Sequence, residues 1–86
     1  MSQPGEHLYQ WLLDQETQGD DDRRFYASYL LGHVSLSMAD HEEHQMPFRD
    51  HLDQSIDAAL EVDRLSETDI TGIRSLIGEY DQSAQA

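Results

Sequence analysis

FYASYLLGHVSLSMA, the segment from Phe25 to Ala39, contains no Asp, Glu, Lys or Arg in a chain of 86 residues whose formal net charge is −13. Burying an unpaired ion is costly, so a long uncharged run predicts a segment that is shielded from water. A helix of this length spans about 22 Å, whereas the hydrocarbon core of a bilayer is about 30 Å thick and requires roughly 20 helical residues. We therefore expect the buried helix of a soluble protein.

Apolar residues recur along the whole chain with the spacing of an α-helix, and no stretch alternates with the period of a strand. The pattern predicts an all-α fold, a single-domain bundle of four helices in which the second helix is central. We expect one domain over residues 1–86. Its four helices should span about 6–18, 22–43, 47–64 and 67–80, followed by a frayed tail at 81–86. A chain of this length has room for one core.

Local signals predict where two of these helices begin. The aspartates at 20–22 offer an N-cap for the second helix and place negative charge at its positive end. Ser66, with Asp69 three residues later, forms a shortened capping box before the fourth helix. Gly72 and Gly78 lie inside the fourth helix and each lowers its helix propensity by about 1 kcal/mol relative to Ala, so we expect it to be the weakest.

The second helix is apolar around most of its circumference, which predicts that other helices surround it. One narrow arc carries only small side chains: Ser28, Gly32, Ser35 and Ala39. Small residues let a neighbouring backbone approach closely, whether from this chain or from the same helix of a second copy. A homodimer built on this small-residue face is therefore one alternative for the function of the chain.

Composition excludes several functional classes. The chain contains 18 acidic residues, five arginines and no lysine, so nucleic acid and anionic membrane surfaces would be repelled, whereas a basic protein would be attracted. The absence of Cys excludes disulfides, a thiolate nucleophile and Cys-ligated zinc. The first ten residues lack the basic start and apolar run of a secretory signal, so we expect a cytoplasmic protein.

Acidic residues gather on one face of the third expected helix. They are Asp50, Asp53, Asp57 and Glu61. Three of them follow each other at intervals of four residues and repel one another, and Arg64 relieves this only in part. The leading hypothesis is a non-enzymatic interaction protein that meets a basic partner through this face or through the aspartates at 20–22.

Three histidines, His41, His44 and His51, lie among acidic residues within the segment 41–51. Imidazole and carboxylate side chains could bind zinc or nickel, so a metal-binding protein or small enzyme is another alternative. No HExxH motif is present, and the spacing fits no known metal motif. A solvated helix C-terminus explains these residues better, and we expect no cofactor.

His33 lies inside the uncharged segment, one turn after Tyr29 and one turn before Ser37. A buried imidazole could act as a general base, oriented by Asp40, but no nucleophile or oxyanion donor accompanies it in the sequence. A core histidine bonded to Tyr29, Ser37 or a backbone carbonyl is the better interpretation. We therefore assign no catalytic residue.

The run YLLGHVSLSMADHE at 29–42 resembles the central G-H-[LV]-[ST]-L-[AS] helix of the YfcL family of small bacterial proteins. Chain length, acidity and the absence of Cys are also similar, although the family has Arg where this chain has Leu31. The resemblance implies a compact all-α cytoplasmic protein of unassigned function, without known catalytic residues. It singles out Gly32 and His33 as motif positions.

Overall fold

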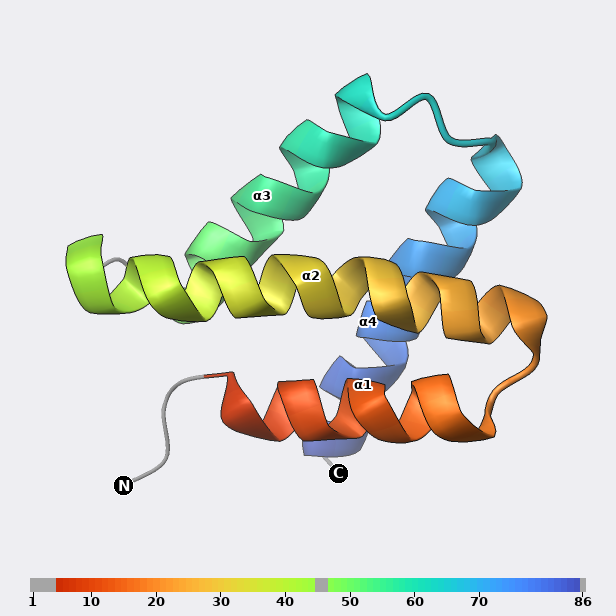
Figure 1. Ribbon diagram of the computed structural model, residues 1–86, viewed down its shortest axis with the longest axis horizontal. Coiled ribbons are helices and arrows are strands. Elements are labelled where there is room, and N and C mark those ends of the chain that lie inside the picture. Colours follow the sequence, from red (N-terminus) through yellow and green to blue (C-terminus); the bar gives the residue numbers. More distant parts are fainter. Residues whose placement is uncertain (1–4, 45–46, 86) are drawn as a thin grey trace.

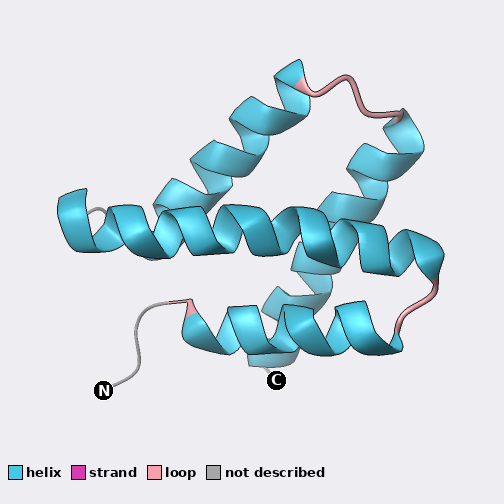
Figure 2. Ribbon diagram, in the orientation of Figure 1, coloured by secondary structure: helices cyan, strands magenta, loops and turns pink. Residues whose placement is uncertain are grey.

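The computed structural model describes residues 5–44 and 47–85, with side chains described for 5–39 and 47–83. Its helices are α1 (Glu6–Gln18), α2 (Asp21–His44), α3 (Phe48–Val62) and α4 (Glu67–Gln85). Every regular element in the described residues is a helix (Figure 2), which confirms the all-α class.

The helices form two layers, and α2, in the front layer, contacts helices of both (Figure 1). In the front layer α1 and α2 run antiparallel, and in the layer behind them α3 rises to a loop from which α4 returns. α2 packs against each of the other three helices, which confirms its predicted central position. The radius of gyration, 12.6 Å, is near the roughly 12 Å expected for a compact domain of this length.

One continuous core holds these helices together. Its buried side chains come from α1 (Leu8, Leu12), α2 (Ala27, Leu30, Leu31, Val34), α3 (Phe48, Leu52, Ile56, Leu60) and α4 (Ile73, Leu76). Within each helix the buried positions recur every three to four residues, with Leu30 and Leu31 of α2 adjacent, which is the pattern of one helix face. Burying each leucine, isoleucine or phenylalanine contributes about 1.5 to 3 kcal/mol, so the core dominates the stability of the fold.

The expectation that α2 is surrounded on all sides is wrong. Three neighbouring helices cover only part of its circumference, because residues 5–44 and 47–85 contain no fifth helix to close the remaining side. Phe25 and Leu36 are 43% and 54% exposed, and the small residues between them are exposed as well. Val62, near the end of α3, is 72% exposed.

Side-chain caps mark the start of α2 and of α4 as predicted. Asp20 accepts a hydrogen bond from the backbone N–H of Arg23 at 2.9 Å, and Ser66 accepts one from the N–H of Asp69 at 3.1 Å. The carboxylate of Asp69 accepts instead from the Tyr26 hydroxyl at 3.3 Å, which ties α4 to α2. Each such cap stabilises its helix by about 1 kcal/mol.

The chain after Tyr80 is helical through Gln85, where the sequence suggested a frayed tail from residue 81. Arg49 of α3 holds this last part of α4, because its Nη1 and Nη2 atoms donate to the two carboxylate oxygens of Asp81 at 2.5 and 2.8 Å. A bidentate pair of this kind fixes geometry better than a single ion contact. Sequence reasoning missed it because the two residues are 32 positions apart.

Packing requires a glycine at residue 72, although glycine has a low helix propensity. The ring of Tyr26 lies against its backbone, so that a Cβ atom at residue 72 would overlap the ring and lie 2.8 Å from its hydroxyl oxygen. A Cβ at Gly78, in the same helix, would meet nothing within 4 Å. Only the first of these two glycines is needed for packing.

Replacing these two glycines should have opposite effects. We expect Gly72→Ala to lower the free energy of unfolding by about 1 to 3 kcal/mol, because the Tyr26 ring must move. Gly78→Ala should raise it by up to about 1 kcal/mol through helix propensity alone. Urea denaturation of both variants measures the difference, and equal effects would contradict the close packing at Gly72.

The Arg49–Asp81 pair should contribute more to the free energy of unfolding than the Arg49–Asp53 pair within α3. We expect Asp81→Asn to cost about 1 kcal/mol of unfolding free energy and to speed amide exchange after residue 81, because it releases the end of α4. Asp53→Asn is the matched control and should cost less than about 0.5 kcal/mol, the usual value for an i, i+4 pair. Unchanged exchange in Asp81→Asn would show that α4 does not depend on this contact.

Candidate functional site

Two histidine–serine contacts join α2 to α3, and we call these four residues the His–Ser seam. His33 Nδ1 lies 2.8 Å from Ser55 Oγ, and His51 Nδ1 lies 3.1 Å from Ser37 Oγ. On each helix the histidine and the serine are four residues apart, so they lie on one face in successive turns. The two contacts are reciprocal and therefore fix how α2 and α3 cross.

The partner predicted for His33 is wrong. Its hydrogen-bond partner is Ser55 of α3, whereas Ser37, which is fully buried, is satisfied by His51. Tyr29 contacts the His33 ring at a centroid distance of 5.0 Å, and its hydroxyl donates to Asp63 at 2.8 Å. The partner is on another helix because the imidazole extends toward α3 rather than along its own helix.

Ser55 places a hydroxyl within hydrogen-bond distance of the His33 imidazole. A serine within hydrogen-bond distance of a histidine is the first element of a nucleophile–base pair. Acyl transfer also requires N–H donors aimed at a developing oxyanion, and Ser55 lies in the interior of α3, where backbone N–H groups bond within the helix. The described geometry is therefore that of a contact that holds two helices together.

The environment of the seam determines its protonation. Burial lowers the pKa of His33, and the nearby carboxylate of Asp63 opposes this effect without cancelling it. Burial, followed by the hydrogen bond to Asp63, raises the pKa of Tyr29 to about 12. At neutral pH the imidazole of His33 is therefore uncharged and the Tyr29 phenol is protonated.

The four predicted partner-binding residues lie together on the outer side of α3. We call this set the acidic face: Asp50, Asp53, Asp57 and Glu61, all of them exposed. Arg49 Nε donates to Asp53 at 2.9 Å, and Arg74 of α4 approaches Asp57 at 3.1 Å. The repulsion expected along this face is thus relieved by these two arginines.

Arg64 does not relieve that repulsion as the sequence suggested. Its backbone has a φ of 51°, in the left-handed region, so the residue has left the helical path of α3. In the described part of the chain, Asp50 and Glu61 are free of ion pairs, which leaves two unbalanced charges near the two ends of the acidic face.

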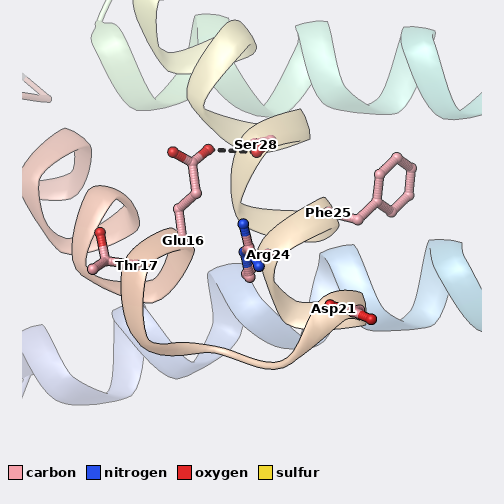
Figure 3. Close-up of a pocket in the computed structure, with 6 residues that line it drawn as sticks. All are labelled: Glu16, Thr17, Asp21, Arg24, Phe25 and Ser28. Carbon is pink, nitrogen blue, oxygen red and sulfur yellow. Dashed lines mark hydrogen bonds between the residues drawn. The ribbon is translucent and has the colours of Figure 1, made fainter.

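A hollow of about 720 Å³ lies between the end of α1 and the first turns of α2 (Figure 3). It is lined by Glu16, Thr17, Asp21, Arg24, Phe25 and Ser28. Glu16 reaches across from α1 and accepts a hydrogen bond from the Ser28 hydroxyl, whereas the Phe25 ring is directed away from that carboxylate. No local sequence pattern predicts this hollow, because it depends on how two helices meet.

Two of the three histidines proposed as a metal site, His41 and His44, have side chains outside the part that the structure describes. His51 directs its Nδ1 atom to Ser37 within the seam. Among the side chains that the structure describes, no three His, Cys, Asp or Glu residues gather as a set of metal ligands.

A four-helix core with α2 at its centre and a surface rich in unpaired carboxylates define a small, acidic, all-α protein. A family model described as YfcL protein matches residues 3–82, so the chain belongs to the YfcL family, as residues 29–42 had indicated. Curated proteins and solved structures give no match to the chain. Within the described residues no helix is both long and apolar enough to cross a bilayer.

The lowered pKa of His33 predicts that acid destabilises the fold. In the unfolded chain the pKa of a histidine returns to about 6.5, so between that pH and the lower folded value the unfolded chain binds more protons. We therefore expect the free energy of unfolding to fall as the pH decreases below about 6.5. The free energy of unfolding from denaturation curves at pH 8 to 5 should depend less on pH in His33→Gln, and an unchanged dependence would contradict a half-buried, neutral imidazole.

Proposed function

We propose that this chain is a cytoplasmic, non-enzymatic interaction protein whose acidic face binds a basic surface of a partner protein. The observation that carries the proposal is that Asp50, Asp53, Asp57 and Glu61 are all exposed on one side of one helix. At 100° per residue they fall within an arc of about 80°, so a single partner surface can contact them together.

The ion pairs on the acidic face leave it available to a partner. The side chains of Asp53 and Asp57 remain 53% and 64% exposed although each contacts an arginine. Asp50 and Glu61 have no such contact within the described residues, and eleven positions separate them, about 16 Å along the helix axis. Arginines or lysines about three helical turns apart on a partner would match the two free carboxylates.

Electrostatics also determines how such a complex behaves. Opposite charges at the edge of an interface accelerate association more than they increase affinity, and salt screens them over about 10 Å at 0.1 M ionic strength. The chain is well suited to this mode, because its net charge of −13 attracts basic surfaces before contact is made. Binding should therefore weaken as salt is added.

The proposal is tested by affinity capture from lysate with the full chain at low and at physiological salt. Asp50→Asn combined with Glu61→Gln should reduce recovery of a specific basic protein about three- to tenfold, because two unpaired carboxylates are lost. Asp14→Asn combined with Glu67→Gln is the matched control, since it removes two exposed charges from α1 and α4. It should retain that protein.

Two outcomes would contradict the proposal. One is the absence of any specific protein whose recovery weakens with salt. The other is equal loss in the α3 variant and in the control, which would indicate attraction to the overall charge and not to the acidic face. Urea denaturation of both variants checks that the fold is intact.

A further inference from the structure

One side of α2 is exposed and carries no charged residue of that helix, and Glu16 of α1 reaches it at Ser28. We call it the open face of α2, and it comprises Phe25, Ser28, Gly32, Ser35, Leu36 and Ala39, all exposed. Phe25 and Leu36 are 43% and 54% exposed, and in the described residues Val62 is the other large apolar side chain so exposed. Phe25 and Leu36 lie eleven positions apart on this face with small side chains between them, which leaves room for a second helix to lie along the stretch.

Gly32 lies at the middle of the open face, and the fold of one chain does not explain it. A Cβ atom there would meet no heavy atom within 4 Å, apart from the nearby backbone of its own helix. Glycine in a helix interior lowers the folding equilibrium constant about fivefold relative to alanine. Gly72, by contrast, makes room for the ring of Tyr26. Close approach by a second molecule would explain the glycine at residue 32 in the same way.

We propose that the open face of α2 is the contact between two copies of this chain, which pack antiparallel about a twofold axis passing near Gly32. Such an axis places each residue before Gly32 opposite the residue equally far after it. Ser28 and Leu36 lie four positions on either side, and Phe25 and Ala39 lie seven positions on either side. The axis thus sets Leu36 against Ser28 and Phe25 against Ala39, a large side chain against a small one each time.

Charge favours a second copy over the basic partner proposed for the acidic face. A chain with a net charge of −13 is repelled by its own copies over most of its surface. From Phe25 to Ala39 α2 itself carries no Asp, Glu, Lys or Arg, so two α2 helices can meet here over about 22 Å without a like-charge contact between them. The carboxylate that reaches this face is that of Glu16 of α1, which accepts a hydrogen bond from Ser28. Along the same stretch a basic partner would find no carboxylate of α2, and the Glu16 carboxylate is already bonded to Ser28.

The oligomeric state of the full chain tests this dimer. Sedimentation velocity from 1 µM to 1 mM should show a monomer–dimer equilibrium that strengthens with added salt, because salt screens the repulsion between two acidic chains. This salt dependence is opposite to that of the acidic face with a basic protein, so failure of one proposal is distinguishable from failure of the other. A monomer at every concentration and salt would overturn the dimer.

Gly32→Leu tests the contact itself. The added side chain begins in open space in the single chain, so the fold should persist, while two leucines would collide at the axis. We expect the dissociation constant to rise at least about tenfold. Ala58→Leu adds the same bulk at an exposed position of α3 and should leave the dimer unchanged. Equal effects of the two variants would overturn the proposed contact.

A cross-link tests the register. The chain contains no Cys, so Gly32→Cys introduces one thiol per copy, and the axis brings the two thiols together. Under mild oxidation, Gly32→Cys should form a disulfide-linked dimer at least about tenfold faster than Ala58→Cys, because the proposed interface juxtaposes only the former. Equal rates would overturn the antiparallel register about Gly32.

Discussion

The burial of one side of α2 against three other helices is the constraint on which the rest of this protein depends. Ala27, Leu30 and Val34 of α2 are fully buried, and α1, α3 and α4 each pack against this helix. In a chain of this length only about 60 to 65 per cent of the unfolded surface is buried on folding. One shared helix therefore lets a small number of apolar residues hold four helices in place.

The few cations of the chain supplement this core. Arg23 joins α2 to Glu79 of α4, while Arg49 and Arg74 join α3 to α4. The contacts of Arg49 and Arg74 position α3 and α4, whose mutual packing is otherwise slight. Among the side chains that the structure describes, most carboxylates have no counter-charge. The resulting acidic surface and the neutral open face of α2 are two surfaces with different chemistry on one small domain.

Sequence reasoning predicted the acidic face correctly as a surface and the seam only in part. The spacing of Asp50, Asp53, Asp57 and Glu61 places them on one side of any helix, whatever that helix packs against. The contacts of Arg74 with Asp57 and of His33 with Ser55 span 17 and 22 positions, and such pairings depend on how helices cross. One usable signal was overlooked, since His51 and Ser55 repeat the four-residue spacing of His33 and Ser37.

The sequence by itself determined the all-α class, the number of helices, their inward stripes and the caps at Asp20 and Ser66, because each follows from interactions between residues a few positions apart. The tertiary structure alone decided which side of α2 stays open, why Gly72 is a glycine and that Asp81 is anchored. Those outcomes depend on where helices distant in sequence come to lie, and a periodic pattern specifies a face to be covered without specifying what covers it.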